Sequence, residues 1–449
     1  MNLTIKEIAD FCGVETHLNG SISKISTDSR DVDGETLFVA LKGERFDAND
    51  FVGEVLGKGA KAVVCSRFDG NDERVLLVED TGKALLDIAK GYREKFKIPV
   101  IALTGSVGKT TSKGMIYAVV SKKYNTLKTA GNLNNEIGVP KTLFGLEESH
   151  EAAVIEMGMN HFGEISVLSK TVQPDIAVIT NVGTAHIENL GSREGILKAK
   201  LEIRDGMKKD TPLIVNGDND MLASFSSDEF KIIRFGLDKD NDMYAENIVQ
   251  TPDGNRFTAV YGDEKAEVFV PAVGLHNVYN ALCAMCVGAV LGYTLKESAE
   301  GVADFESEGM RQKVREVRGM TFIEDCYNAN PDSMSAALET LKTLKKTRTI
   351  AVLSDMLELG SYSEKAHREV GEKTAQTGCD YVFTFGEQAK NISESASENG
   401  VNAKAFSDKA ELTKYLDGFL KEGDTVLFKG SRGMKTEEIF KTLYKEWEV

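Results

Sequence analysis

The stretch Pro99–Thr111, PVIALTGSVGKTT, decides the fold class of this chain. Its first residues are apolar and predict a short buried strand, whereas TGSVGKTT at Thr104–Thr111 is a glycine loop that leads into a helical pattern starting at Lys109. A strand, a glycine loop and a helix in this order surround phosphate oxygens with backbone amides and a helix N-terminus. The segment therefore predicts a phosphate-binding loop, and we call Thr104–Thr111 the phosphate loop.

The phosphate loop predicts ATP as the ligand. Lys109 would reach the terminal phosphates, and Thr110 would place its hydroxyl on Mg²⁺. The general pattern has glycine five residues before the Gly108–Lys109 pair, where this chain has Leu103, so the loop is a shortened variant. An incidental glycine turn is the alternative, and the strand and helix on either side disfavour it. The candidate cofactor-binding residues here are Thr104, Gly105, Ser106, Val107, Gly108, Lys109 and Thr110.

The same alternation of apolar strands and helical patterns extends along the chain of 449 residues, a length that suggests two to four domains. Apolar runs separated by helical periodicity predict βαβ units and a mostly parallel sheet. The expected fold is therefore α/β with three domains. They are a small mixed α/β domain at 1–97, a central doubly wound ATPase-like domain at 98–311 and a Rossmann-like domain at 312–449. Only the stretch 242–270 predicts consecutive strands instead.

Composition excludes several classes of function. Lys+Arg of 54 against Asp+Glu of 70 gives a net charge of −16, which disfavours nucleic acid as a partner. The N-terminus lacks a secretory signal, and the longest apolar stretch, 281–293, is shorter than the ~20 residues of a membrane span. A cytoplasmic protein without a membrane span is expected. Six scattered cysteines do not indicate a disulfide framework, and Cys283 and Cys286 lie in an apolar helical run typical of core.

Polar residues after the predicted strands are candidates for a metal site. Glu156 ends one buried strand and His186 follows the next, at the edge of the sheet where ligands collect. A solvated glutamate and a structural histidine are the alternatives. Lys200 lies four residues after Ile196 and three after Leu197 on a helix, a spacing that favours a lysine whose stem is buried and whose amine reaches water.

Two further positions could contact a nucleotide. Asn277 and Asn280 share one face at the start of a helix, either as amide donors to a base edge or as ordinary helix-start residues. Arg311, at the junction with the third domain, could supply a cation to a transferring phosphoryl group when domains close.

Together these segments resemble the Mur ligase superfamily, the ATP-dependent amide-forming enzymes of peptidoglycan precursor synthesis. The resemblance implies that Asn280 contacts the adenine and that Arg311 and Asp325 contact the γ-phosphate and the nucleotide. It implies that CO₂ carbamylates Lys200, which turns a cation into an oxygen ligand for a second Mg²⁺. The implied metal ligands are Thr110, Glu156, His186 and Lys200, and the implied catalytic residues are Lys109, Glu156, His186, Lys200 and Arg311.

Within the superfamily the chain is similar to the enzymes that join D-alanyl-D-alanine to UDP-N-acetylmuramoyl-tripeptide through an acyl phosphate. The segments that carry this similarity are STDSRDVDGETLFVALKGERFDANDF at 26–51, GNLNNEIGVP at 131–140, IEMGMNHFGEI at 155–165, DCYNANPDSM at 325–334, SDMLELG at 354–360 and KGSRGMK at 429–435. The resemblance implies three groups of substrate-binding candidates, which are Ser29, Arg30, Phe46 and Asp47 for the UDP sugar, Asn134 and Asn135 for the peptide, and Tyr327, Asn328 and Asn330 for the dipeptide.

Other interpretations stay open at this point. The segment DSR at 28–30 is also typical of a turn with a salt bridge. A folylpolyglutamate synthase-like ligase shares the phosphate loop and the lysine chemistry but lacks a separate UDP-sugar module. A nucleotide-dependent switch needs neither the metal cluster nor the polar motifs of the third domain. The pattern leaves open the third residue of the tripeptide, lysine or diaminopimelate, as well as the oligomeric state.

Overall fold

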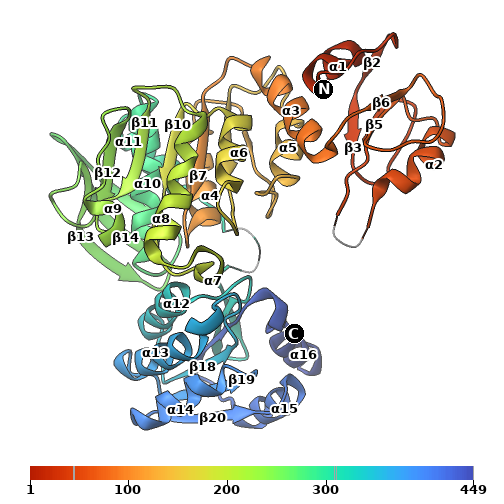
Figure 1. Cartoon of the computed structure of the whole chain (residues 1–449). Helices are drawn as coiled ribbons and strands as arrows, with labels where there is room; N and C mark the ends of the chain where they lie inside the picture. Colours follow the sequence, from red (N-terminus) through yellow and green to blue (C-terminus); the bar gives the residue numbers. More distant parts are fainter. Residues whose placement is uncertain (44–45, 308, 310, 448–449) are drawn as a thin grey trace.

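The computed structural model describes residues 1–43, 46–307, 309 and 311–447, which form three parts along the chain (Figure 1). The N-terminal part has a parallel sheet in the order β3-β4-β5-β6 and a small antiparallel pair, β1-β2. Its elements are β1 (Leu3–Thr4), α1 (Ile5–Cys12), β2 (Ser21–Ile22), β3 (Lys24–Ser26), β4 (Thr36–Val39), η1 (Ala48–Phe51), α2 (Val52–Gly57), β5 (Ala62–Cys65), β6 (Val75–Leu77) and α3 (Thr81–Glu94).

The central part is built on a nine-stranded sheet in the order β15-β14-β13-β12-β11-β10-β7-β9-β8. Its strands are β7 (Val100–Thr104), β8 (Thr126–Lys128), β9 (Ala152–Glu156), β10 (Ile176–Ile179), β11 (Pro212–Asn216), β12 (Lys231–Gly236), β13 (Met243–Thr251), β14 (Gly254–Tyr261) and β15 (Glu264–Val270). Its helices are α4 (Lys109–Val120), α5 (Gly138–Leu143), α6 (Glu164–Val172), α7 (Ile187–Leu190), α8 (Arg193–Leu201), η2 (Glu202–Gly206), α9 (Asp220–Ala223), α10 (His276–Val290) and α11 (Leu295–Ala303).

The pairing in this sheet follows the sequence pattern. Strands β8 to β13 pair in parallel, and β13, β14 and β15 pair antiparallel, which confirms the strands expected at 242–270. Every residue of β7, β9 and β10 is buried because helices cover both faces of the sheet. Helices α4, α10 and α11 pack on one face, and the cluster that contains α3 and α6 lies on the other. Cys283 and Cys286 belong to this core, as predicted.

The third part has a six-stranded sheet in the order β16-β17-β21-β18-β19-β20, parallel except for β16. Its elements are β16 (Lys313–Val317), β17 (Met320–Asp325), α12 (Pro331–Thr343), β18 (Arg348–Ser354), η3 (Gly360–Tyr362), α13 (Ser363–Gln376), β19 (Tyr381–Phe385), α14 (Lys390–Glu398), β20 (Asn402–Phe406), α15 (Lys409–Phe419), β21 (Asp424–Lys429), η4 (Arg432–Met434) and α16 (Glu437–Glu446).

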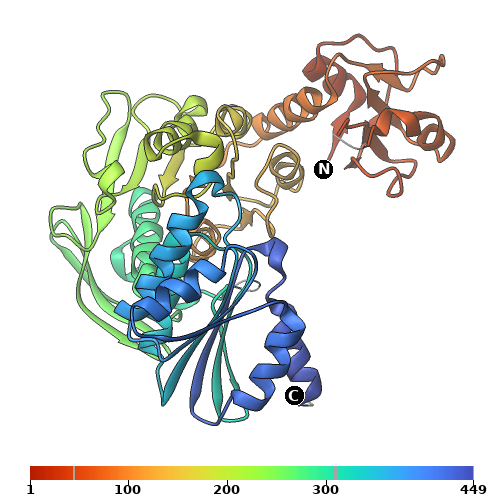
Figure 2. The same ribbon diagram turned by 60° about the horizontal axis from the view of Figure 1, so that its bottom comes forward.

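The three parts are arranged unevenly in space. Figures 1 and 2 show the third part against the central sheet, whereas the N-terminal part projects away from both. The α/β fold with several sheets agrees with the fold class predicted from the sequence. Within the described residues, every helix is either too short or too polar to span a membrane.

Candidate active site

A cleft of about 630 Å³ lies between the carboxyl ends of the central strands and the third part. Glu156 at the end of β9, Asn181 after β10 and Asn216 at the end of β11 line it from the central sheet. Asp325 and Tyr327, at and after the end of β17, line it from the other side. The carboxyl ends of parallel strands are where doubly wound sheets bind ligands, so the cleft is the natural place for the chemistry.

The phosphate loop forms one wall of this cleft. Gly108 has a φ of 80°, a left-handed conformation that glycine adopts readily, and α4 begins at the next residue. The backbone N–H groups of 108–111 have no hydrogen-bond acceptor among the described residues, so they remain available at the start of α4. The Lys109 ammonium donates to the Gly105 carbonyl at 2.7 Å. Burial lowers the pKa of Lys109, Glu156 opposes that shift, and the charge of Arg311 adds to it.

Glu156 is only 2% exposed and connects three segments of the central part. Its carboxylate accepts hydrogen bonds from Thr110 Oγ1 at 3.1 Å and from Asn134 Nδ2 at 2.8 Å. Lys113 Nζ lies 3.5 Å from Glu156 Oε2. The structure thus places the predicted Thr110, Asn134 and Glu156 together and adds Lys113, which the sequence analysis missed. Its position one turn after Lys109 on α4 was the available signal.

Lys200 is only 1% exposed, so it is not the surface lysine that helical spacing alone favours, and its burial is compatible with the ligand role that the resemblance implies. Helix α8 packs this face inward instead of leaving it at the surface. Burial lowers the pKa of Lys200 well below its usual range, and the nearby charge of Lys109 lowers that pKa further. No described residue accepts a hydrogen bond from the amine.

His186 lines the cleft with a φ of 63° and faces the third part. Its Nδ1 lies 2.9 Å from Glu358 Oε2, which is within ion-pair range although the ring nitrogen makes no hydrogen bond of normal geometry. His186 lowers the pKa of Glu358, and burial partly opposes that effect. A residue predicted to be a metal ligand therefore contacts a carboxylate from the SDMLELG segment.

Asn277 and Asn280 are both buried and line the cleft, and their amides bond mainly within the protein. Asn280 Oδ1 accepts from Ser112 Oγ at 2.9 Å, and Asn280 Nδ2 donates to Asn277 Oδ1 at 3.0 Å. Asn277 Nδ2 donates to the Val273 carbonyl at 2.8 Å. These bonds tie α10 to α4 directly behind the phosphate loop.

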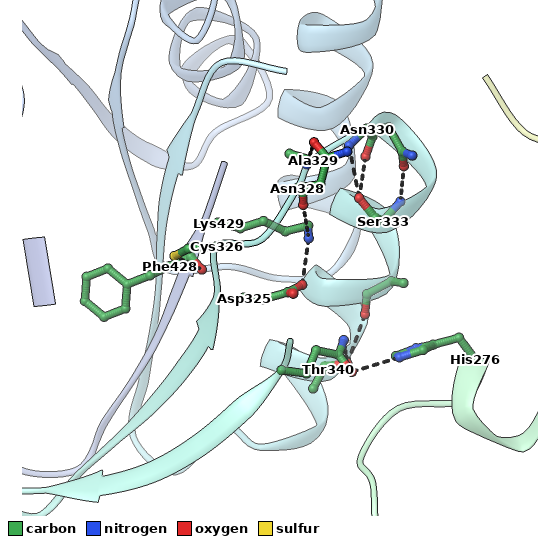
Figure 3. A network of polar contacts seen from close by, with 12 residues as sticks. His276, Asp325, Cys326, Asn328, Ala329, Asn330, Ser333, Thr340, Phe428 and Lys429 are labelled. Atoms are coloured by element: carbon green, nitrogen blue, oxygen red, sulfur yellow. Dashed lines mark hydrogen bonds and ion pairs between the residues drawn. The ribbon is translucent and has the colours of Figure 1, made fainter. Parts of the chain in front are cut away.

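A buried ion pair connects β17 and β21 in the wall formed by the third part (Figure 3). Lys429 Nζ, at the end of β21, lies 2.6 Å from Asp325 Oδ2 and donates to the Asn328 carbonyl at 3.1 Å. Asn330 caps α12 through Ser333 N. Lys429 lines the cleft, and the sequence analysis did not single it out although KGSRGMK contains it.

Arg311 and His276 also connect this wall to the central part. The Arg311 guanidinium lies 4.0 Å from the centroid of the Tyr327 ring, a cation–π distance. His276 Nε2 lies 2.8 Å from Gln312 Oε1, and Gln312 Nε2 donates to Thr340 Oγ1 at 3.5 Å. The predicted residues Arg311, Asp325, Tyr327, Asn328 and Asn330 therefore share one wall of the cleft.

The candidates of the N-terminal part do not line this cleft. Arg30 pairs with Asp28 at 2.6 Å, which matches the turn with a salt bridge considered for that segment. The Ser29 carbonyl accepts from Lys58. Asp47 caps η1, and Phe46 is 58% exposed with its ring stacked near Phe51. Asn135, in contrast, lines the cleft next to Asn134, and its Oδ1 accepts a hydrogen bond from Gly138 N at 2.9 Å, where α5 begins.

Comparison with known proteins identifies the family. The description "Mur ligase family, catalytic domain" matches residues 21–93, "Mur ligase middle domain" matches 103–288, and "Mur ligase, glutamate ligase domain" matches 310–432. UDP-N-acetylmuramoyl-tripeptide–D-alanyl-D-alanine ligase of Bacillus subtilis (strain 168) is 41% identical over 94% of this chain and 93% of that protein. This chain belongs to the Mur ligase family.

Other Mur ligases resemble this chain in sequence or structure over nearly its whole length. The Escherichia coli (strain K12) protein of the same name is 37% identical over 99% of this chain and 98% of its own length. The crystal structure of MurF from Acinetobacter baumannii has a TM-score of 0.92 at 33% identity and covers 99% of both chains. MurF ligase from Thermotoga maritima in complex with ADP has a TM-score of 0.87 at 30% identity, over 95% of this chain and 98% of that one. A Mycobacterium tuberculosis folylpolyglutamate synthase, at 16% identity and a TM-score of 0.63, shares the fold alone.

Proposed function

We propose that this chain is an ATP-dependent ligase that joins D-alanyl-D-alanine to UDP-N-acetylmuramoyl-tripeptide in peptidoglycan precursor synthesis. The observation that carries the proposal is the composition of the cleft. A phosphate loop with open amides faces Arg311, Asp325 and the 325–330 loop across one cavity, in a chain that matches ligases of this name from end to end. We place this reaction in the cytoplasm, where ATP and the nucleotide-linked substrate would meet.

The chemistry needs charge neutralisation more than a protein nucleophile. The terminal carboxylate of the tripeptide attacks the γ-phosphate of ATP, and the bond to ADP breaks, which leaves an acyl phosphate. The neutral amine of D-alanyl-D-alanine then attacks the acyl carbon, phosphate leaves, and a proton is released as the new amide forms. Lys109, Arg311 and the amides of 108–111 stand where they can offset repulsion between two anions.

The residues around Glu156 fit Mg²⁺. Thr110 and Glu156 present oxygen donors 3.1 Å apart beside the phosphate loop, the ligand type that Mg²⁺ prefers while it keeps phosphate oxygens and waters. When bound, Mg²⁺ would neutralise charge on the phosphates. Among the described residues, no three His, Cys, Asp or Glu side chains cluster into a complete metal site. A second ion near His186 would need another oxygen ligand, which a carbamate on Lys200 would provide.

The remaining roles follow the three parts of the chain. We assign UDP-sugar binding to 1–97, with Ser29, Arg30, Phe46 and Asp47 as contacts, ATP binding to 98–311 and the dipeptide side to 312–449. Asn134 and Asn135 would line the path of the peptide, because both residues lie at the wall of the cleft beside Glu156. Tyr327, Asn328 and Asn330 would face the dipeptide, and Asn280 and Asp325 the nucleotide.

The experiment that tests the function measures ADP release by the purified protein with ATP, Mg²⁺ and UDP-N-acetylmuramoyl-tripeptide, with and without D-alanyl-D-alanine. One new amide per ADP, formed only when both substrates are present, is the expected result. ADP release that ignores the dipeptide would indicate a nucleotide switch. A requirement for folate and glutamate would indicate a folylpolyglutamate synthase-like ligase, and either result would overturn the proposal.

A further inference from the structure

Asn181 accepts hydrogen bonds from the first half of the phosphate loop. The sequence analysis gave this residue no role. It lies just after β10 and lines the cleft. Its Oδ1 accepts hydrogen bonds from the backbone N–H of Ser106 at 3.0 Å and of Val107 at 2.9 Å. The Asn181 carbonyl also accepts from Ser106 N at 3.2 Å. One side chain therefore holds two consecutive amides of the loop.

The residues on both sides of Asn181 hold the same part of the loop. Thr180 Oγ1 donates to the Val107 carbonyl at 2.7 Å, and Gly183 N donates to Ser106 Oγ at 2.9 Å. A Cβ on Gly105 would lie 1.9 Å from Thr180 Oγ1, so only glycine allows β10 and the loop to approach this closely. The loop is thus seated on the end of β10 by contacts that span more than 70 residues of sequence.

The two halves of the phosphate loop have different partners. The amides of Ser106 and Val107 bond to Asn181, whereas the amides of 108–111 have no acceptor among the described residues. A backbone amide that is left without a partner in a cleft is costly unless a ligand or water accepts a hydrogen bond from it. The open amides are the ones at the positive end of α4, where an anion binds best.

From this division we propose that Asn181 is a positioning residue for the nucleotide: it occupies the Ser106 and Val107 amides and so presents the amides of 108–111 to the phosphates. The inference rests on the proposed ATP site. Asn181 acts through the loop, and its effect is on how tightly the phosphates are held and not on the groups that react. A neutral carboxamide suits this role, because it accepts two hydrogen bonds without bringing a negative charge into an anion site.

Two variants separate the effect of losing the hydrogen-bond acceptor from the effect of adding a negative charge. Asn181→Ala removes the side-chain oxygen that accepts from both amides, which leaves the Val107 amide without an acceptor, whereas Ser106 N keeps the backbone carbonyl of residue 181 at 3.2 Å. Asn181→Asp keeps an oxygen that accepts both N–H groups and adds a negative charge to the cleft. We expect Asn181→Ala to loosen the loop and weaken ADP binding, and Asn181→Asp to keep the loop ordered while still weakening ADP binding.

The test is hydrogen–deuterium exchange of the segment 103–111 in the full-length protein without nucleotide. Exchange of the Val107 amide should rise on the order of tenfold in Asn181→Ala, because that amide loses its hydrogen bond, and should stay near wild type in Asn181→Asp. Exchange of the Ser106 amide should rise less, because the backbone carbonyl of residue 181 still accepts from it. Asn216→Ala is the matched control for exchange. Asn216 lines the same cleft after the neighbouring strand, but its Oδ1 accepts from Asp218 N, outside the phosphate loop.

Titration calorimetry with ADP and Mg²⁺ supplies the second measurement. We expect ADP affinity to fall on the order of tenfold in both Asn181 variants at an unchanged melting temperature for Asn181→Asp. Unchanged exchange in Asn181→Ala, or unchanged ADP affinity in both variants, would overturn the positioning role. Failure of the wild type to bind ADP would instead refute the proposed function, and the exchange result, obtained without ligand, would distinguish the two. If Asn181→Ala does not fold, exchange in Asn181→Asp decides: near-wild-type exchange of the Val107 amide supports the hydrogen bond from Val107 N to this side-chain oxygen, and a rise on the order of tenfold would overturn it.

Discussion

The buried ion pair between Lys429 and Asp325 provides a sharp test of how the third part is held together. Lys429 is 2% exposed and Asp325 is 8% exposed, and their charged atoms lie 2.6 Å apart. Lys429→Met keeps most of the apolar stem and removes the charge. The substitution leaves the Asp325 carboxylate and the Asn328 carbonyl without their buried donor.

The size of the effect follows from burial. Removing one partner of a buried pair costs about 3–5 kcal/mol, because the remaining charge is left uncompensated. For a unit of this size that loss lowers the melting temperature by roughly 10–17 °C. A second substitution, Asp325→Asn, should recover part of the loss in the double variant, since it removes the unpaired charge while keeping the shape of the side chain.

The assay is differential scanning calorimetry of the full-length protein. Lys346→Met is the matched control. Lys346 lies in the same part and pairs with Glu316 at 2.8 Å, but the two side chains are 48% and 60% exposed. A surface pair is worth about 0–1 kcal/mol, so this variant should melt within about 3 °C of wild type. Equal melting temperatures for Lys429→Met and Lys346→Met would refute the argument from burial.

Three further predictions concern the loop, the buried lysine and a buried histidine. Gly105→Ala should weaken ATP binding by at least roughly tenfold in calorimetry, because overpacking costs about 1–3 kcal/mol and its Cβ would lie 1.9 Å from Thr180 Oγ1. Gly418→Ala, which meets nothing within 4 Å, should bind ATP normally. Lys200→Ala should lose most turnover and regain part of it with a short-chain carboxylic acid, and full activity without that acid would remove Lys200 from the metal site. Burial lowers the pKa of His367, against the opposing effects of the Ser363 carbonyl and Asp355, and its Nε2 accepts from Met356 N at 3.0 Å. Stability should therefore fall as pH drops below about 6.5, where the unfolded chain binds the proton more readily. His367→Gln should flatten that slope of melting temperature against pH, and identical slopes would contradict it.

The local pattern of the sequence was enough to predict the main strands and the order of strand, loop and helix. Apolar runs of four or five residues predicted β7, β9 and β10, and PVIALTGSVGKTT predicted the order of strand, loop and helix, because both signals are encoded in consecutive residues. The same holds for the alternating strands β13 to β15. The motif residues at strand ends were also predictable, since parallel strands bring their carboxyl ends to one edge whatever the details of packing.

Side-chain burial and pairing were decided only in three dimensions. The spacing around Lys200 is compatible with an inward or an outward amine, and only the packing of α8 buries it. The grip of Asn181 on Ser106 and the pairing of Lys429 with Asp325 join residues 75 and 104 positions apart. Periodicity within one element carries no information on such partners, because their contact depends on which strands become neighbours in the sheet. The sequence by itself therefore determined the elements and the phosphate loop, whereas the tertiary structure decided which charges are buried and which amides remain open to a ligand.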